Sequence, residues 1–498
     1  MKIEFEFVHD SNNSKIWIIE KKDKKIIIEY GKKGSKLQKK ISSFSTTEKA
    51  TNEYNKRIKE KLNKGYEKVS KKTSKKSSKK SSKKINPAIS IETNNKFIDF
   101  LKIIVDKVGD EMDRFYQLYK SKKTGEEFPW ELYNKNMSLF YNKKYKNIPI
   151  QIEKFQNKKI LPYLKSGIIV KKINTKIKED LLNLIDKYSN KINKDYHPGS
   201  NNKVLDIVHP SLYPLITNNK PNKNKLDFWN RPYEDSKYQW LPSEFKIDST
   251  GKCTIETYIN NLPITEKPLY EQIEKLFELV LPYFEDIWSY SNTFDFYDGD
   301  WDLKYKDIGV LKKLNLKNRN LQVITKIVKI SLKNNDDLLG AWHVEGMSHE
   351  NIVATATCTL EQDDKFNTEL YFKRMYSAQE VGDIHDTMIQ DMPKEISNLL
   401  HNTLVPLGKT KITDGTIVVF PNSHIHKVDM SSSIKIEQTR TIIVFWLINP
   451  EVTITSTKDI DQQKYSIDKA HKERLKLMEE RTYYKQTFNQ RDLNLCEH

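Results

Sequence analysis

The segment KKTSKKSSKKSSKK, residues 71–84, constrains the fold of this chain more than any other stretch of its sequence. It has eight lysines and no apolar residue in fourteen positions, so it cannot build a core. We therefore expect a flexible, self-repelling linker over 71–94, joining a small module at 1–70 to one long unit at 95–498. Its lysines also offer salt-sensitive affinity for phosphates, which phosphorylation of its serines would weaken.

The positive charge of the chain is concentrated at the same end. The net charge is +18, and residues 1–90 hold 26 Lys and Arg against 10 Asp and Glu. The other 408 residues hold 59 against 57. This asymmetry favours a polyanion-binding module attached to a nearly neutral body.

The cysteines, the N-terminus and the apolar runs of the sequence bear on where in the cell the protein is found. Three cysteines are too few for a disulfide framework, the N-terminus is not a signal peptide, and the apolar run TIIVFWLI at 441–448 is too short to span a bilayer. We expect an intracellular protein, cytoplasmic or nuclear, that does not use a membrane. The abundance of Lys, Asn and Ile, which have A/T-rich codons, hints at a large DNA virus, where a viral factory or virion would be the location.

Residues 1–70 have the pattern of a small α/β module. Alternating apolar residues predict strands at 2–8, 15–21 and 24–31, followed by a turn at 32–36. A helix is expected over 45–66, with a capping box formed by Ser45 and Glu48 and an end at Gly65.

The order of Trp17, then YGKKGSKLQKKISSF from Tyr30, then a capped helix ending in KGY resembles the WGR domain of poly(ADP-ribose) polymerases. The signature Trp-Gly-Arg is here Tyr30-Gly31-Lys32, which keeps an aromatic face and a charge but loses the fork of arginine. Since that family binds DNA or RNA, the resemblance implies nucleic-acid binding through residues 1–84. The expected contact residues are Tyr30, Gly31, Lys32, Lys33, Lys36, Lys39 and Lys40.

The long unit has a helical and loop-rich part at 95–320, strand patterns at about 321–450, and a charged helix at about 464–485. We therefore expect an α+β fold class for the chain.

Within the strand region, WHVEGM at 342–347 puts His343 and Glu345 on one face, because side chains of a strand alternate. An imidazole and a carboxylate together suit Fe(II), Mn(II) or Zn(II). The alternative is an exposed pair on a structural strand.

A third ligand has to come from elsewhere, and the best donor segment is DGTIVVFPNSHIHKVDM at 414–430, which offers His424 and His426. Two histidines and one carboxylate would form a facial triad with three open positions. Further on, Arg440 immediately precedes the apolar run at 441–448, for which we expect a strand. An arginine entering a β-core needs an anionic partner, and the C5 carboxylate of 2-oxoglutarate is a natural one.

Several long segments resemble, in order, one family of domains of unknown function that is assigned to the fold of the Fe(II)/2-oxoglutarate dioxygenases. They include YQWLPSEF at 238–245, GAWHVEGMSHENIVAT at 340–355 and VVFPNSHIHKV at 418–428. The resemblance implies a double-stranded β-helix core of the jelly-roll or cupin-like type, with the metal ligands His343, Glu345 and His426. It also implies 2-oxoglutarate on Arg440, with Lys326 as the second choice of anchor, and ascorbate as a possible reductant.

The sequence therefore predicts an Fe(II)- and 2-oxoglutarate-dependent oxygenase that a WGR-like module targets to nucleic acid or to a protein bound there. It would hydroxylate or demethylate a base or a protein residue, with no catalytic residue beyond the metal ligands. Two alternatives remain. One is a non-catalytic nucleic-acid-binding protein with a β-helix scaffold, and the other is a cupin-type metal enzyme that does not use 2-oxoglutarate.

Overall fold

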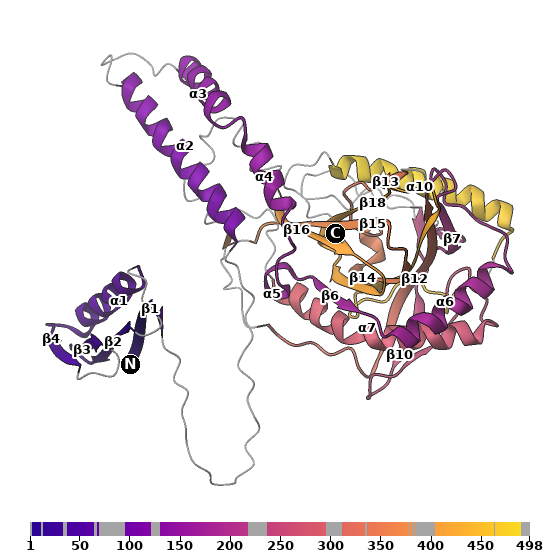
Figure 1. Cartoon of the computed structure of the whole chain (residues 1–498), viewed down its shortest axis with the longest axis horizontal. Helices are drawn as coiled ribbons and strands as arrows, with labels where there is room; N and C mark the ends of the chain where they lie inside the picture. The colour runs from indigo at the N-terminus through magenta and orange to yellow at the C-terminus, as the bar shows by residue number, and fades with distance from the viewer. Residues whose placement is uncertain are drawn as a thin grey trace, which may run out of the picture. The chain divides into compact units, whose positions relative to one another are not determined.

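The computed structural model divides the chain into two compact units, residues 1–86 and 87–498, which are described separately below (Figure 1). It describes residues 2–10, 13–32, 37–63, 67–68, 95–120, 130–217, 237–294, 311–333, 336–377, 379–380, 384, 404–462 and 464–489. The linker expected at 71–94 lies outside the described residues.

The N-terminal unit is a five-stranded antiparallel sheet with one helix on it. The strand order is β4-β3-β2-β1-β5, with β1 at Lys2–Asp10, β2 at Asn13–Lys22, β3 at Lys25–Lys32, β4 at Gln38–Ser43 and β5 at Glu67–Lys68. Alternate residues of the central strands, among them Trp17 and Ile28, are buried against Tyr54 of helix α1 (Thr47–Asn63). One face of the sheet thus builds the core of this small unit.

The start of helix α1 differs from the expected capping box of Ser45 and Glu48. The hydroxyl of Thr46 accepts the backbone N–H of Lys49 at 3.1 Å, so Thr46 is the residue that caps the helix. The sequence SSFSTTE offers several hydroxyls in a row, and local backbone geometry decides which one is used.

The large unit is built on two antiparallel sheets, and the α+β class expected from the sequence is confirmed. The larger sheet has the order β11-β10-β12-β19-β14-β17-β6, and β7 also pairs with β12. Its strands are β6 (Ile169–Lys172), β7 (Val204–Val208), β10 (Ser243–Ile247), β11 (Cys253–Ile255), β12 (Arg319–Leu332), β14 (Ile352–Gln362), β17 (Thr416–Pro421) and β19 (Gln438–Ile448). The smaller sheet has the order β13-β18-β15-β16, with β13 at Asp337–Leu339, β15 at Phe366–Arg374, β16 at Val405–Ile412 and β18 at Ile425–Ser432. A short pair, β8 (Leu215–Ile216) and β9 (Tyr238–Gln239), is hydrogen-bonded to neither sheet.

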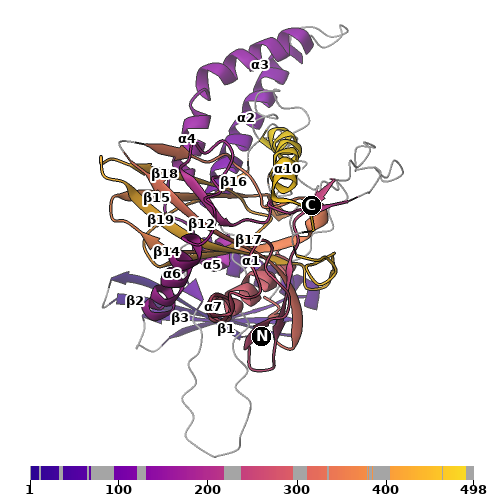
Figure 2. The same ribbon diagram turned by 90° about the vertical axis from the view of Figure 1, so that its right-hand side faces the viewer.

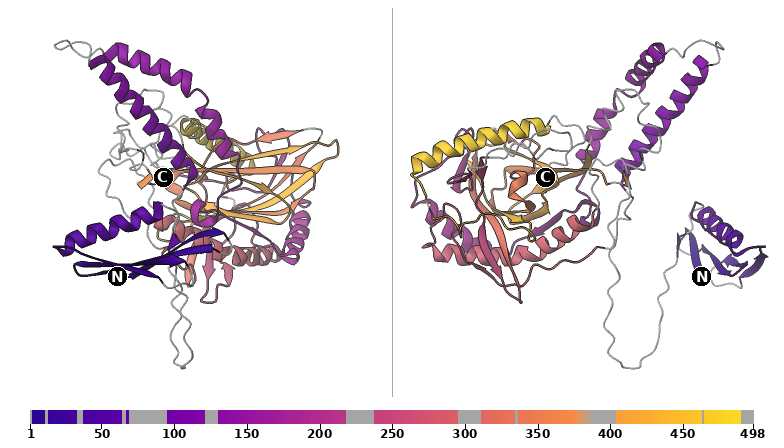
Figure 3. Two further views of the ribbon diagram at one scale, coloured as in Figure 1. Left: turned by 60° about the vertical axis from the view of Figure 1, so that its left-hand side comes forward. Right: turned by 180° about the vertical axis from the view of Figure 1, so that it is seen from behind.

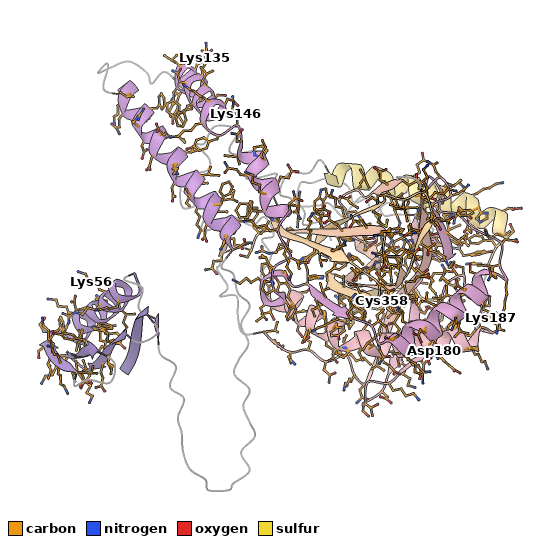
Figure 4. All side chains as sticks on the ribbon, in the orientation of Figure 1. Lys56, Lys135, Lys146, Asp180, Lys187 and Cys358 are labelled. Atoms are coloured by element: carbon orange, nitrogen blue, oxygen red, sulfur yellow. The ribbon has the colours of Figure 1, made fainter. Side chains whose placement is uncertain are left out.

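The two sheets share a core, and the face of each sheet that points into it is called the inner face below. Strand alternation separates the two faces of β19: Val444 and Trp446 point inward, where they pack with Met430 of β18. Phe445 points the other way and packs on Phe277 of helix α7 at 5.4 Å between ring centroids. Cys358 of β14 is fully buried on that second side (Figure 4).

Helices cover the larger sheet and extend from the smaller one. Helices α6 (Thr175–Ser189) and α7 (Lys267–Thr293) pack on the outer face of the larger sheet, while α10 (Ile467–Asn489) lies on the opposite side of the body (Figure 2). Helices α2 (Lys96–Lys120) and α3 (Trp130–Lys144) pack together and extend away from the sheets, and α4 (Ile148–Gln156) leads back to β16 (Figure 3). Helix α5 (Tyr163–Ser166) and the short 3-10 helix η1 (Ser348–Glu350) complete the described helices. None of the helices in the described ranges is long and apolar enough to cross a membrane.

Candidate metal centre

The segment that follows β13 runs beside β18 and carries the first candidate ligand. The N–H of Gly340 donates to the carbonyl of Val428 at 2.8 Å, and further along His343 and His426 exchange two backbone hydrogen bonds of 3.0 and 2.9 Å. Residues paired in this way across antiparallel strands point to the same side. The two imidazole rings accordingly lie 4.4 Å apart between centroids, although 82 residues separate them in the chain.

Gly340 is needed for this close approach of the two chains. A Cβ atom at Gly340 would lie 2.5 Å from the carbonyl oxygen of Val428, which is backbone and cannot move aside easily. We expect Gly340→Ala to lower the free energy of unfolding by about 1–3 kcal/mol, as overpacking does. The matched control is Gly109→Ala in helix α2, where a Cβ meets nothing within 4 Å and alanine should stabilise by up to about 1 kcal/mol. Equal effects of the two substitutions in urea unfolding would contradict this reading of Gly340.

Glu345 is held in place through its backbone. The side chain of Asn422, in the turn between β17 and β18, accepts the N–H of Glu345 at 2.9 Å and donates to its carbonyl at 2.8 Å. The same amide donates to the carbonyl of Ile352 at 3.1 Å, so it also ties this segment to the start of β14. Asn422 thus acts like a short piece of neighbouring strand and fixes where the Glu345 carboxylate points.

The side chains of His343, Glu345 and His426 converge. Their candidate ligand atoms all lie within 4.8 Å of one another. The Glu345 Oε1 atom is 3.8 Å from Nε2 of His343 and 3.4 Å from Nε2 of His426. Burial acts to raise the pKa of the Glu345 carboxyl, but the attraction of the two nearby imidazoles outweighs it and holds the pKa well below its usual range. The carboxylate is therefore ionised between two histidines.

Both imidazoles are oriented so that Nε2 is the atom left for a ligand. Nδ1 of His343 lies 2.8 Å from the carbonyl oxygen of Ala341, and Nδ1 of His426 lies 3.4 Å from that of His424. Because a carbonyl only accepts, each Nδ1 carries a proton. A proton on Nε2 can face Glu345 while the ligand is absent, and its loss would leave the Nε2 lone pair for a metal. Burial, followed by the nearby His343, lowers the pKa of His426, which favours the neutral ring that a metal requires.

The surroundings of His426 are apolar. Its ring lies 4.7 Å from that of Phe420 and 6.2 Å from that of Phe372, which come from β17 and β15. His424, the other histidine of the donor segment, is turned away, and its Nε2 lies 2.5 Å from the carbonyl oxygen of Ser166. Burial lowers the pKa of His424 to about 3, in keeping with a neutral ring in a structural position.

Arg440 enters the inner face as the sequence suggests, and it is 2 % exposed. Its guanidinium contacts the sulfur of Met430 at 3.6 Å and the hydroxyl of Thr359 at 3.3 Å, while its Nε has no hydrogen-bond partner. Among the described residues, no carboxylate pairs with it. Burial lowers the pKa of Arg440 to about 10, so this charge is costly unless an anion joins it.

Lys326, the second candidate anchor, has a different environment. It lies on β12 opposite Val444, so strand alternation puts it on the inner face as well. Burial acts to raise the pKa of the Asp206 carboxyl, but the surrounding imidazoles and Lys326 outweigh it and lower that pKa to about 2. The charge of Lys326 is therefore already compensated in part, unlike that of Arg440.

A second group of possible ligands, which the sequence did not suggest, consists of His197, Asp206 and His209. Nδ1 of His197 lies 2.8 Å from the Asp206 carboxylate, which also has the guanidinium of Arg474 at 3.7 Å. Nδ1 of His209 accepts the backbone N–H of Ser211 at 3.1 Å, so a neutral His209 carries its proton on Nε2 and has no lone pair left. This cluster fits a buried charge network better than a cation site.

The expected nucleic-acid residues of the N-terminal unit lie along β3 and β4. Tyr30 is 40 % exposed and shares the helix-facing side of the sheet with Lys40, as their register with Gln38 and Ile28 requires. Lys39 points to the other side, where it pairs with Glu29 at 3.2 Å. Gly31 and Lys32 end β3. Lys33 and Lys36 lie outside the described residues.

Two residues that support the centre were not expected from the sequence. One is Asn422, for which the only signal was its place in the turn FPNSH. The other is Glu350. It is adjacent to His349, so the two repeat the residue types of His343 and Glu345 without the spacing that puts both side chains on one face of a strand. Glu350 is fully buried and its carboxylate accepts the N–H of Met347 at 2.8 Å, which closes the loop after Glu345.

The fold and the site together define a two-sheet α+β protein with a His–Glu–His cluster suited to a divalent metal and a separate small N-terminal unit. The chain belongs to the family described as "Protein of unknown function (DUF4246)", whose model matches residues 142–299 and 298–471. A WGR domain matches residues 1–73, which confirms the N-terminal assignment and suggests nucleic-acid binding.

Comparison with individual proteins adds little. None of the curated proteins matches the chain. A structural-genomics structure of a protein from Bacteroides fragilis is 33 % identical over 14 % of this chain and 19 % of its own length, with a TM-score of 0.13. AviO1 from Streptomyces viridochromogenes is 9 % identical over 61 % of this chain and 96 % of its own length, with a TM-score of 0.24. Both TM-scores are too low to bear on the fold or function of this chain.

Proposed function

We propose that the chain is an Fe(II)- and 2-oxoglutarate-dependent oxygenase whose two-sheet core is a double-stranded β-helix. The observation that carries the proposal is the buried charge of Arg440 on the same inner face as His426, with no carboxylate partner among the described residues. A two-histidine, one-carboxylate set that leaves open positions suits Fe(II). A buried arginine nearby suits the far carboxylate of the cosubstrate.

In this proposal His343, Glu345 and His426 hold Fe(II), and Arg440 holds 2-oxoglutarate. With both bound and O2 as the oxidant, the centre would supply the chemistry to hydroxylate a substrate C–H bond, and hydroxylation of a methyl group on nitrogen would lead to loss of that methyl group. The chain's own residues bind and orient. The carbonyls of Ala341 and His424 fix the imidazoles, and Asn422 fixes Glu345. The aromatic rings beside His426 keep water away from one side of the centre.

Arg440 is the better anchor of the two candidates because its charge is uncompensated. Met430, which its guanidinium contacts, lies four residues after His426 on β18, and both side chains are on the inner face. Four residues of strand span about 13 Å, so the guanidinium and the cluster lie on the same inner face within a few residues of each other.

Substitution of Arg440 tests this assignment with two readouts. Arg440→Met removes a buried charge that has no partner, so we expect the ligand-free protein to unfold at a higher temperature. The same variant should lose the stabilisation that 2-oxoglutarate gives to the wild-type protein in the presence of a divalent metal. Thermal unfolding with and without 2-oxoglutarate measures both.

Lys326→Met is the matched control for Arg440→Met. If only Lys326→Met loses the effect of 2-oxoglutarate, then the lysine is the anchor and our assignment is wrong. If the wild-type protein binds metal but shows no response to 2-oxoglutarate, the cupin-type alternative is favoured.

The WGR domain supports the second half of the proposal, which is targeting. A module that holds nucleic acid raises the effective concentration of any substrate on that nucleic acid for the attached enzyme. The proposal is compatible with two kinds of substrate, a nucleobase and a residue of a protein bound to the nucleic acid.

A further inference from the structure

The outer face of the smaller sheet, next to the metal centre, carries a group of cations and aromatic rings. Since His426 and Phe372 point inward, their neighbours along β18 and β15 point outward. Tyr371 lies in register between Lys427 of β18 and Lys409 of β16. The group, called the lysine face here, consists of Lys373, Lys409, Lys411, Lys427, Trp342 and Tyr371.

The lysines of this face outnumber its carboxylates. Lys409 pairs with Glu369 at 2.8 Å, and Lys427 pairs with Asp429 at 2.8 Å. Within the described part of the chain, Lys373 has no carboxylate partner. The face therefore keeps a surplus of positive charge even after its ion pairs are formed.

Two of the ammonium groups converge on one ring. Nζ of Lys373 lies 4.3 Å from the ring centre of Trp342, and Nζ of Lys427 lies 5.7 Å from the same ring and 4.7 Å from that of Tyr371. Attraction to the rings helps to hold both cations there. Burial, and then the charge of Lys427, lower the pKa of Lys373, which is the sign of a cation that gains from a bound anion.

The same ring is joined directly to the metal centre. Trp342 immediately precedes His343, so in an extended chain the indole and the imidazole point to opposite sides of one segment. A long, flexible substrate that crosses this edge of the sheet can touch the lysines and reach the metal. A single strand can turn out one nucleotide toward the centre directly, whereas a duplex would first have to unpair and unstack it.

We propose that Lys373 and Lys427, held over Trp342, bind a backbone phosphate of a single-stranded nucleic acid that is presented to the metal centre. The inference rests on the proposed function and deepens it, because it selects a nucleic acid over a bound protein as the substrate. The phosphate contact is independent of sequence and weakens with salt.

Photo-crosslinking of the full-length protein to a short bromouracil-substituted oligonucleotide, made once as RNA and once as DNA, separates this contact from that of the WGR domain. In the wild-type protein we expect crosslinks on the peptides that contain Trp342 or Tyr371, and these should fade as salt rises from about 50 to about 200 mM. The pair Lys373→Met with Lys427→Met should reduce these crosslinks about tenfold or more and leave those of residues 1–84 unchanged.

Two further variants guard against trivial outcomes. Lys435→Met, at an exposed lysine in the turn before β19, should leave all crosslinks unchanged. Replacing Lys373 and Lys427 with arginine should restore crosslinking, which a merely unfolded variant could not do. Crosslinks confined to residues 1–84, or displacement by an acidic peptide at lower concentration than by the oligonucleotide, would overturn the proposal. The crosslink needs neither metal nor 2-oxoglutarate. If the oxygenase proposal fails, the wild-type protein will still crosslink, but metal and 2-oxoglutarate will not raise its unfolding temperature.

Discussion

Glu345→Ala is expected to abolish tight metal binding at the centre while the protein remains folded. The carboxylate is the only anion of the cluster, and without it two neutral imidazoles are left to hold a divalent cation. We expect the affinity for Fe(II) or Co(II) to fall by about a hundredfold or more. This loss is larger than the one expected on removing a residue that only hydrogen-bonds to a metal ligand. Thermal unfolding under anaerobic conditions measures this, since metal at a hundredfold excess over its dissociation constant stabilises the wild-type protein by about 2.7 kcal/mol.

The control for this substitution is Glu437→Ala, at an exposed glutamate just before β19. It should respond to metal as the wild-type protein does. If Glu345→Ala is stabilised by metal as strongly as Glu437→Ala, the ligands are elsewhere. The cluster of His197, Asp206 and His209 would then have to be reconsidered, and Asp206→Asn would be the next variant.

A second large effect is expected where helix α10 is fastened to the loop after Glu345. The buried carboxylate of Glu350 accepts from Nη2 of Arg481 at 2.5 Å and from the N–H of Trp240 at 2.5 Å. The guanidinium of Arg481 also lies 3.9 Å from the ring centre of Trp240. Arg481→Met leaves the carboxylate buried without its cation, so the free energy of unfolding should fall by about 3–5 kcal/mol.

A double-mutant cycle separates the ion pair from packing. Adding Glu350→Gln to Arg481→Met removes the stranded charge, so the double variant should recover much of the lost stability in urea unfolding. Lys472→Met, at an exposed position on the same helix, should change the free energy of unfolding by less than about 0.5 kcal/mol. Additive effects of the two buried substitutions would mean that Glu350 and Arg481 do not act as a pair.

The parts of this molecule that could be predicted from sequence are those with a local signal. The lysine run separates two units because no apolar residue occurs in it, and the module before it was recognised as a WGR domain from its own motifs. The spacing of His343 and Glu345 depends only on strand alternation. That Arg440 is buried follows from its place at the head of a continuous apolar strand.

What could not be predicted depends on pairing between distant segments. Nothing in the sequence states that the segment after β13 runs beside β18, which is what makes His343 and His426 opposite each other. Asn422 and Glu350 look like ordinary polar residues until the turn and loop that they tie are placed. The register of β3 and β4 likewise separates Lys39 from Lys40, although the two are adjacent in the chain.

The most direct test of the central claim is the visible spectrum of the full-length protein with Fe(II), recorded without oxygen as 2-oxoglutarate is added. We predict a charge-transfer band in the wild-type protein, a higher requirement for 2-oxoglutarate in Arg440→Met, and no band in Glu345→Ala. Fe(II) that binds with an affinity dependent on Glu345, but gives no band at any concentration of 2-oxoglutarate, would contradict the account.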